Sequence, residues 1–401
     1  MRILHVTYIF PPKPNVADGI THSVYQLTST LAKNGNDVTV YASNALDLHG
    51  KERIEINNSP ACVDGVKVRY FPYLLRYGTF FFTPSMFRLI RDEIKKFDVI
   101  HIHDARCFQC AITMHYAELF NIPIIFQPRG SFKSSSPHGT LRKLLRLFID
   151  KLYAENILQK CSKMIALTPV EAEQYRRVGV PKEKITIIPN GIDLSEYTNL
   201  PLKGSFKKKL HIDKDKKVIL YIGRIHMIKG IDVLVRAYAY AVNNLELRNA
   251  LLVLVGPDDG YLGELKQLLS SLKVNDILLI GPLYGKDKLE AYIDADAFIL
   301  PSRYETFPNV VLEAYACSKP AVASNIMSIP DIVINERTGL LFRSGDVEDL
   351  AKKIIYMLSH VEESKEMGIE ARKFVEEKLS INKVTASLES LYEEILKGED
   401  R

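Results

Sequence analysis

The chain has 401 residues, of which 47% are hydrophobic and 25% are charged, and its mean hydropathy is −0.03. These values exclude a disordered or fibrous chain, and the length predicts two domains because single cores usually stop growing at roughly 250 to 300 residues. The net charge of +5 is small and no nucleic-acid motif is present, which favours anionic small ligands over nucleic acid.

The first half of the chain alternates short apolar runs with amphipathic stretches. The amphipathic stretches include SVYQLTSTLAKNG and CAITMHYAELFN. The apolar runs are typical of strands, and they are ILHVTY, DVTVYAS, VKVRYF, DVIHIH, PIIFQ, KMIALT and ITIIP. Strands that alternate with helices of this length predict an α/β protein with parallel sheets and βαβ crossovers.

The alternation pauses at the segment PNGID, and a polar stretch follows. It restarts with the strand-like runs VILYIG, ALLVLVG, DILLIG, DAFILP and PAVAS, and it ends in a helical tail. We therefore expect an N-terminal Rossmann-like domain over residues 1–192, a linker over 193–215, a C-terminal Rossmann-like domain over 216–378, and a helix over 379–401 that packs back on the first domain. Two doubly wound domains of this kind would face each other across a cleft.

The first candidate site follows the run VILYIG. Gly223-Arg224 and Lys229-Gly230 lie between this strand and the helical stretch IDVLVRAYAYAV. In doubly wound sheets, ligands bind beyond the carboxyl ends of the strands, and anions are stabilised at helix N-termini. Two cations at such a position predict a clamp for a diphosphate. The alternative is that Arg224 and Lys229 are ordinary solvated loop charges.

The second candidate site follows the run DAFILP and lies within PSRYETFPNVVLEAYACSKP. Pro308 and Asn309 predict a helix start, whose backbone N–H groups would receive hydroxyl or phosphate oxygens. Glu313 would then lie about one turn into the helix and accept hydrogen bonds from ribose hydroxyls, and Glu305 would face the sugar. The alternative is that Glu313 is a solvent-facing helix residue.

The motifs GR-x4-KG and E-x7-E resemble the donor signatures of the retaining glycosyltransferases of family 4, which have the GT-B fold of two Rossmann-like lobes. The resemblance covers nearly the whole chain and includes FDVIHIHD, the PNGID segment and LVGPDDG. It implies that Arg224, Lys229 and Glu305 are the catalytic residues. It implies a donor-binding set of Gly19, Gly223, Arg224, Lys229, Glu305, Phe307, Pro308, Asn309 and Glu313.

The same resemblance implies a chemistry. The donor would be a UDP-, GDP- or ADP-linked sugar, and neither a metal nor another cofactor would be required. Retention in such enzymes is described as a front-face substitution in which the leaving diphosphate takes the acceptor proton. The role of the protein would then be electrostatic, because two cations and a helix N-terminus stabilise the departing charge.

The first domain departs from the family pattern at two positions on its acceptor side. Asp18-Gly19 replaces two adjacent glycines, so Gly19 still supplies a close backbone N–H, whereas Asp18 would orient an acceptor hydroxyl. The segment QPRG stands where family members often have a histidine that contacts the donor sugar, and a PRG variant occurs in a branch active in polysaccharide and lipopolysaccharide assembly. Arg129 would serve the acceptor or a phosphate, or else bridge the two lobes. His103, at the end of a strand, would face the cleft.

Three further patterns have ordinary explanations. HIHDARCFQC resembles metal-ligand spacing, but strand and helix periodicities would have to converge on one ion, so we expect no zinc. The five cysteines are odd in number and scattered, which favours reduced thiols. Asp258-Asp259 is typical of a solvated turn rather than of a metal-binding pair of carboxylates.

The sequence favours a cytoplasmic protein, because no run of about 18 uncharged apolar residues occurs and the opening MRILHVTYIF lacks signal-peptide features. YLLRYGTFFFTPSMFRLIRDEIKK and GTLRKLLRLFIDKLYAENILQK are apolar, aromatic and basic at helical spacing. Such helices fit peripheral contact with the inner face of a membrane, or core packing with a basic rim.

Together these features predict a hexosyltransferase that acts on a glycan or a lipid-linked saccharide in polysaccharide, lipopolysaccharide or glycoconjugate assembly. One alternative is a sugar-nucleotide epimerase of the same fold, which would convert the donor without an acceptor. Another is a non-catalytic nucleotide-sugar-binding protein, which would keep Arg224 and Lys229 but lose Glu305.

Overall fold

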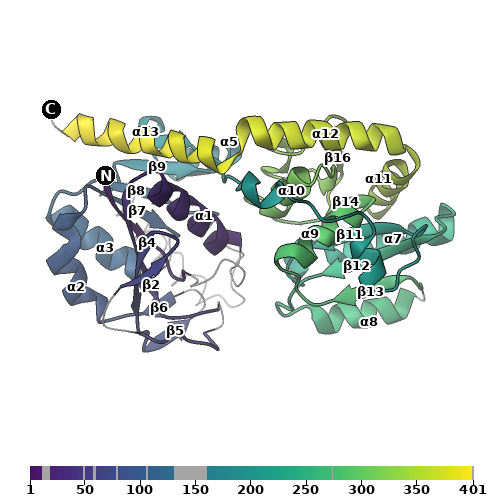
Figure 1. The fold of residues 1–401 in the computed structure, drawn as a ribbon, viewed down its shortest axis with the longest axis horizontal. Helices are drawn as coiled ribbons and strands as arrows, with labels where there is room; N and C mark the ends of the chain where they lie inside the picture. Colours follow the sequence, from purple (N-terminus) through teal and green to yellow (C-terminus); the bar gives the residue numbers. More distant parts are fainter. Residues whose placement is uncertain are drawn as a thin grey trace. The chain divides into compact units, whose positions relative to one another are not determined.

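The computed structural model describes residues 1–10, 19–47, 50–56, 60–77, 80–104, 107–130, 160–272 and 274–399 (Figure 1). The chain forms two compact units. The first comprises Met1–Gly191 together with Ile381–Arg401, and the second comprises Ile192–Ser380. The C-terminal segment therefore belongs to the same unit as the N-terminus.

The first unit is built on a sheet with the strand order β10-β9-β8-β7-β1-β2-β4-β3. Its neighbouring strands pair in parallel except β3 and β4, which are antiparallel. The strands are β1 (Arg2–Val6), β2 (Asp37–Ser43), β3 (Ala61–Val63), β4 (Val66–Phe71), β7 (Val99–His103), β8 (Ile124–Gln127), β9 (Lys163–Ala166) and β10 (Ile185–Ile187). A separate antiparallel hairpin is formed by β5 (Leu75–Tyr77) and β6 (Phe80–Phe82). The direction of chain winding reverses at β1, which lies between β2 and β7.

Helices cover both faces of this sheet. They are α1 (Gly19–Lys33), α2 (Met86–Glu93), α3 (Phe108–Leu119), α5 (Pro169–Arg177) and α13 (Ile381–Glu399), with the 3-10 helices η2 (Ile94–Lys96) and η3 (Lys182–Lys184). Ile3 packs in the apolar cluster with α1 and α13, whereas its neighbour Leu4 packs in the cluster with α2, α3 and α5. This alternation follows from the two-residue repeat of a strand, and it gives the three-layer arrangement.

The C-terminal helix α13 begins at Ile381 and lies beside α1 (Figure 1). Val384, Leu388 and Leu391 bury its apolar face. Tyr392 Oη lies 2.7 Å from Nδ1 of His101 on β7. The helix is therefore part of the first unit and contributes a polar contact to its sheet.

The second unit is built on a parallel sheet with the strand order β13-β12-β11-β14-β15-β16. The strands are β11 (Lys217–Ile222), β12 (Ala250–Val255), β13 (Ile277–Ile280), β14 (Ala297–Leu300), β15 (Ala321–Ser324) and β16 (Gly339–Phe342). The order reverses between β11 and β14, and this is the topological switch point of a doubly wound sheet. The predicted α/β class and parallel sheets are confirmed.

The helices of the second unit connect these strands. They are α6 (Ser205–Lys209), α7 (Ile231–Asn244), α8 (Leu262–Leu272), α9 (Gly285–Asp294), α10 (Asn309–Ala316), α11 (Val347–Ser359) and α12 (Val361–Lys378), with the 3-10 helices η4 (Leu194–Tyr197), η5 (Met227–Lys229) and η6 (Ile329–Asp331). The segment 193–215, for which the sequence predicted a linker, carries η4 and α6 in this unit. Asp294 at the end of α9 accepts a hydrogen bond from the backbone N–H of Lys207 at 2.9 Å, which ties α6 to α9.

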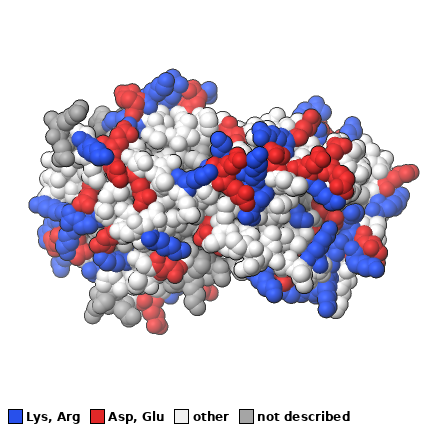
Figure 2. All heavy atoms as spheres, turned by 45° about the horizontal axis from the view of Figure 1, so that its top comes forward, with Lys and Arg blue, Asp and Glu red and all other residues white. Residues whose placement is uncertain are grey.

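The surface carries both signs of charge. Figure 2 shows acidic and basic side chains interspersed over the face that it presents, without a single basic stripe. Within the described parts of the chain, no helix is both long and apolar enough to span a membrane.

Candidate active site

Both candidate motifs lie at the switch point of the second unit. Strands β11 and β14 are neighbours, with Ile219 opposite Ala297 and Leu220 opposite Phe298. Their carboxyl ends therefore bring the loop that follows β11 next to the loop that follows β14. In doubly wound sheets this is the edge at which ligands bind.

The loop after β11 packs directly against the backbone at the end of β14. Gly230 has a φ of 66°, and a Cβ atom there would lie 2.0 Å from the carbonyl oxygen of Pro301. Ile228 accepts a hydrogen bond from the backbone N–H of Arg303 at 2.8 Å. Nδ1 of His226 accepts one from the N–H of Ile228 at 3.0 Å. Only glycine fits at position 230, and the loop that carries Lys229 is held from both sides.

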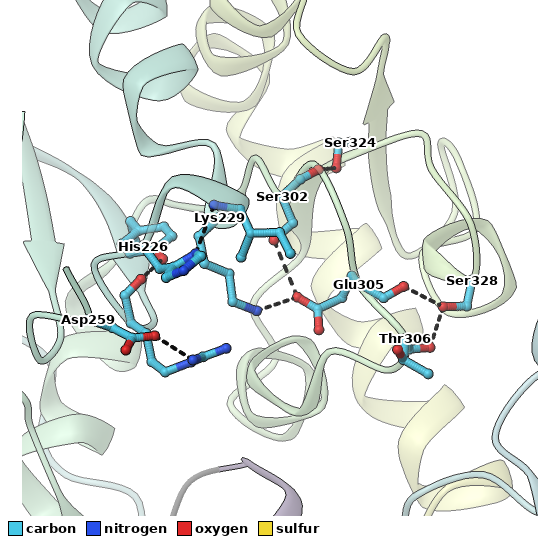
Figure 3. A network of polar contacts seen from close by, with 11 residues as sticks. His226, Lys229, Asp259, Ser302, Glu305, Thr306, Ser324 and Ser328 are labelled. Atoms are coloured by element: carbon cyan, nitrogen blue, oxygen red, sulfur yellow. Dashed lines mark hydrogen bonds and ion pairs between the residues drawn. The ribbon is translucent and has the colours of Figure 1, made fainter. Parts of the chain in front are cut away.

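Lys229 and Glu305 form an ion pair across this contact (Figure 3). Nζ of Lys229 lies 2.6 Å from Oε2 of Glu305, and the side chains are only 16% and 13% exposed. Ser302 Oγ lies 3.3 Å from the same carboxylate oxygen. The structure thus brings together two residues that the sequence assigned to different motifs.

The backbone around Glu305 is fixed by serines from the next part of the sheet. Ser328 Oγ donates to the carbonyl oxygen of Glu305 at 3.2 Å and also to that of Thr306 (Figure 3). Ser324, the last residue of β15, donates to the carbonyl oxygen of Ser302 at 2.6 Å. These bonds hold the loop after β14 in one conformation.

Arg224 pairs with Asp259, which corrects the expectation of a solvated turn for that residue, whereas Asp258 is exposed as expected. Nη1 of Arg224 lies 2.5 Å from Oδ2 of Asp259, and the guanidinium side chain is 45% exposed. Asp258 caps α8 instead, because its Oδ1 accepts hydrogen bonds from the backbone N–H groups of Gly260, Tyr261 and Leu262. These bonds lower the pKa of Asp258. The two neighbouring carboxylates therefore have different roles.

Helix α10 begins at Asn309, as predicted, with Pro308 at its N-cap. Glu313 is 7% exposed, which excludes the alternative of a solvent-facing residue. Its Oε1 lies 2.8 Å from Nζ of Lys288, and its Oε2 accepts from Tyr292 Oη at 2.9 Å. Burial opposes the charge on Lys288, but the Glu313 carboxylate prevails and raises the pKa of that lysine.

Sequence reasoning missed Lys288 and Tyr292. Both lie on α9, four residues apart, and so share one helix face. That spacing was available as a signal, but only the packing of α9 near α10 shows which carboxylate they contact.

The remaining donor-side predictions are placed as follows. Phe307 is 8% exposed and precedes α10 directly. Gly223 follows β11, and a Cβ atom there would lie 2.7 Å from Tyr221 Oη, which itself donates to the carbonyl oxygen of Arg224. Gly223 is thus required for packing of the loop that carries Arg224.

The predicted acceptor-side residues lie in the first unit. Asp18 is outside the described residues, and Gly19 is the first residue of α1. His103 is fully buried, which differs from the expectation that it faces an open cleft. Its Nε2 lies 2.9 Å from Nδ1 of His5, and its Nδ1 lies 3.3 Å from Nε of Arg129.

The structure separates the cysteines of the run HIHDARCFQC from its histidines. Cys107 and Cys110 form a disulfide at the start of α3, which corrects the expectation of five reduced thiols. Their Cα atoms are 5.4 Å apart, within the usual range for a disulfide, because they occupy one helical turn. His101 and His103 instead group with His5, since β1 and β7 pair with His5 opposite His101.

Two family models match the chain. Glycosyltransferase Family 4 matches residues 17–196, and Glycosyl transferases group 1 matches residues 203–374. The chain belongs to these glycosyltransferases, which have the GT-B fold.

Relatives and solved structures agree with this family. The glycosyltransferase is 28% identical over 380 residues to the D-inositol 3-phosphate glycosyltransferase of Actinosynnema mirum, which covers 88% of this chain and 87% of the relative. It is 27% identical over 277 residues to the UDP-Gal:alpha-D-GlcNAc-diphosphoundecaprenol alpha-1,3-galactosyltransferase of Escherichia coli, with 68% of each chain covered. HepE of Anabaena, solved in complex with UDP and glucose, has a TM-score of 0.75 at 17% identity, with 98% and 99% covered.

Proposed function

We propose that this glycosyltransferase moves a hexose, with retention, from a nucleotide-diphosphate sugar to a glycan or lipid-linked saccharide in polysaccharide, lipopolysaccharide or glycoconjugate assembly. The observation that supports it best is the pairing of two cations with two carboxylates at the switch point of the second unit. Lys229 pairs with Glu305, and Arg224 pairs with Asp259. A diphosphate would offer these cations stronger, multidentate acceptors.

Arg224 and Lys229 would hold the donor diphosphate and stabilise the charge that develops as it leaves. Arg224 is exposed enough to meet a ligand, and a guanidinium binds phosphate oxygens in a bidentate manner. Lys229 is largely shielded from water, where a fixed charge acts more strongly on a developing negative charge. Gly223, next to Arg224, would maintain the loop conformation that presents this guanidinium, because a Cβ atom there would meet Tyr221 Oη.

The two glutamates would orient the rest of the donor. Lys288 and Tyr292 hold the carboxylate of Glu313 in place near the start of α10, where it would accept hydrogen bonds from ribose hydroxyls. Glu305 would face the transferred sugar. The backbone of Phe307, Pro308 and Asn309 forms the entry to α10, where the partial positive charge of a helix N-terminus favours oxygen ligands.

The first donor to test is a UDP-sugar, because the related fold of HepE is solved with UDP and glucose. The acceptor would bind on the first unit, with Gly19, Asp18, His103 and Arg129 as its proposed residues. The names of both relatives include a phosphate ester or a diphosphate, which favours a phosphorylated acceptor.

We also propose peripheral contact with the cytoplasmic face of an anionic membrane. Large apolar side chains are exposed within residues 74–88, and they are Leu74, Leu75, Tyr77, Phe80 and Phe87. Arg76 and Arg88 lie in the same segment, and a mixed aromatic and basic surface suits the membrane interface. Sedimentation with anionic vesicles tests this, with L75E as the variant expected to lose binding.

The decisive assay incubates the protein with UDP-glucose and UDP-galactose, with and without candidate acceptors, and follows the anomeric proton of the product by NMR. Transfer with an α-anomeric product from an α-linked donor supports a retaining transferase. Conversion of the donor sugar without an acceptor would instead identify an epimerase. Binding without any turnover over the acceptor panel would favour a non-catalytic binding protein.

A further inference from the structure

Arg129 is a buried cation that no carboxylate among the described residues contacts directly. The residue is 7% exposed, and the described residues offer its guanidinium two hydrogen-bond acceptors. Nη1 donates to Oδ1 of Asn190 at 2.6 Å, and Nε donates to Nδ1 of His103 at 3.3 Å. Burial lowers the pKa of His103 well below its ordinary value, so both partners are neutral.

The nearest carboxylate that influences Arg129 is already committed to the backbone. The oxygens of Glu171 accept from the N–H groups of Gly130 and Leu167 at 2.8 and 2.7 Å. Burial raises the pKa of Glu171, which weakens it further as a counter-ion. Burial also lowers the pKa of Arg129, to about 10, so the guanidinium is still positive at neutral pH. The fold thus retains a charge whose desolvation it offsets only in part.

The backbone conformation of Arg129 also indicates a ligand-binding site. Arg129 has a φ of 51°, in the left-handed region that residues with a Cβ adopt at a cost in free energy. Such conformations cluster at ligand-binding sites because the surrounding structure holds them in place. Arg129 also follows the carboxyl end of β8, on the edge of the sheet at which parallel α/β units bind ligands.

A cavity of about 10 Å³, with room for one water molecule or one ligand hydroxyl, lies beside the guanidinium, wholly within the first unit. Arg129, Asn190, Gln127, His101 and Ser23 are among the residues that line it. Nε2 of His101 and Oε1 of Gln127 are buried and have no hydrogen-bond partner in the described part of the chain. Tyr392 Oη lies 2.7 Å from Nδ1 of the same ring. Buried polar atoms without partners mark a place where a ligand or water completes the bonding.

The charge decides what kind of ligand fits. His5, His101 and His103 place nitrogen atoms within 4.8 Å of one another, a grouping that otherwise suits a cation. The Arg129 guanidinium lies 3.3 Å from one of these nitrogens, so a metal ion here would be repelled. The same field attracts an anion.

We propose that Arg129, oriented by Asn190 and His103, binds an anionic group, a phosphate or a carboxylate, that the acceptor carries. This inference rests on the proposed function, because the bound anion belongs to an acceptor only if the protein is the proposed transferase. Gln127 Oε1 would accept a hydroxyl of the same molecule. The substrate class is therefore an anionic, hydroxyl-bearing acceptor, whose charged group belongs either to a small molecule or to a lipid diphosphate.

The sharpest test is Asn190→Asp, which keeps the shape of the side chain and places a carboxylate 2.6 Å from Nη1 of Arg129. If Arg129 has only a structural role, this substitution supplies a counter-ion and leaves the chain folded and active. If Arg129 binds an anion, the new carboxylate neutralises it and closes the site. Asn121→Asp adds the same charge at an exposed position and is the matched control.

The readout is calorimetric titration of the full chain with inorganic phosphate. The background is R224A/K229A, so that phosphate does not bind to the second unit. We expect this double variant to bind phosphate, N190D to weaken that binding at least tenfold, and N121D to leave it unchanged. R129Q should weaken it as N190D does, and circular dichroism confirms that both variants are folded. Equal phosphate affinity in N190D and its parent, or no binding by the parent, would overturn the proposal.

A second arm identifies the source of the anion. Neutral vesicles with and without a polyprenyl diphosphate are sedimented with the same variants. Diphosphate-dependent binding that N190D abolishes assigns the site to a lipid-linked acceptor, whereas binding of inorganic phosphate alone assigns it to a small acceptor. Neither arm measures transfer. A negative transfer assay would therefore overturn the proposed function without affecting the phosphate-binding result, and a negative phosphate titration would overturn this inference without affecting the transfer result.

Discussion

Nζ of Lys229 lies 2.6 Å from Oε2 of Glu305, and this ion pair joins the loop after β11 to the loop after β14. Both side chains are mostly shielded from water, so the pair interacts more strongly than an exposed one would. Gly230 against Pro301, and Ser328 on the backbone of Glu305, hold the two loops in place. The charges of the proposed donor site are therefore held in place by the fold itself, which is the condition for electrostatic catalysis.

Glu305→Gln should separate binding from chemistry. Glutamine keeps the size of the side chain but removes the charge that pairs with Lys229. We expect the affinity for a nucleoside diphosphate to be kept or raised, because Lys229 is released, while kcat falls by about 100-fold, as for loss of one fixed electrostatic contact. Titration and steady-state kinetics measure the two effects. An unchanged kcat would remove Glu305 from the catalytic set.

Asp259→Asn should tighten binding of the nucleoside diphosphate by several-fold. The Asp259 carboxylate engages Nη1 of Arg224 and so competes with a phosphate for the guanidinium, whereas the neutral amide of asparagine competes less well. Asp258→Asn is the matched control, since asparagine caps a helix about as well as aspartate and should change neither thermal stability nor binding. If Asp259→Asn weakens binding, the carboxylate orients Arg224 rather than competing for it.

Arg303 is a positioning residue for the loop that carries Lys229. Its guanidinium donates to the carbonyl oxygen of Met227 at 2.8 Å and makes two bonds of 2.6 Å to Asp232. Lysine cannot reproduce this planar fork. Arg303→Lys should raise KM for the donor by roughly tenfold, the loss of one charged contact, with little change in Tm.

The control for this variant is Arg337→Lys, which alters an exposed ion pair with Glu370 elsewhere in the second unit. It should change neither KM nor Tm. Equal effects of the two substitutions on KM would show that Arg303 has no special relation to Lys229.

The three buried histidines should make the first unit sensitive to acid. Burial lowers the pKa of His5 from 6.5 to about 3, and the pKa values of His101 and His103 are also lowered by burial. At pH values between the ordinary pKa of 6.5 and the lowered pKa of the folded state, the unfolded chain binds protons that the folded chain does not. The free energy of unfolding therefore falls as the pH falls below 6.5. Each such histidine contributes a slope of about 1.4 kcal/mol per pH unit.

Thermal unfolding between pH 7.5 and 5.0 measures this slope. His5→Gln should reduce it, because one titrating group is removed. A first-unit transition whose midpoint is independent of pH over this range is incompatible with three buried neutral histidines.

The sequence was sufficient for the parts of the fold that depend on local periodicity. Apolar runs that alternate with amphipathic stretches predicted the parallel sheets, and Pro308 predicted the start of α10. The motif positions after VILYIG and DAFILP assigned Lys229 and Glu305 to one predicted site, and the two side chains are in contact because parallel strands end at one edge.

Contacts between distant segments could not be predicted in the same way. Lys288 reaches Glu313 only because α9 packs near α10, and His5 meets His101 only through the register of β1 with β7. The sequence placed Asp259 in a solvated turn together with its neighbour Asp258. The folded chain instead brings Asp259, which follows β12, next to Arg224, which follows the neighbouring strand β11. Partner identity is a property of tertiary packing, which sequence spacing does not specify.

The central claim is that Arg224 and Lys229 hold the diphosphate of a nucleotide-sugar donor. Calorimetric titration of the wild-type chain and of R224A/K229A with UDP, GDP and ADP tests it most directly. The account predicts that the wild type binds at least one of the three and that the folded double variant loses this binding by at least 100-fold, as expected when two charged phosphate contacts are removed. Binding of no nucleotide by the wild type, or equal affinity in the double variant, would contradict it.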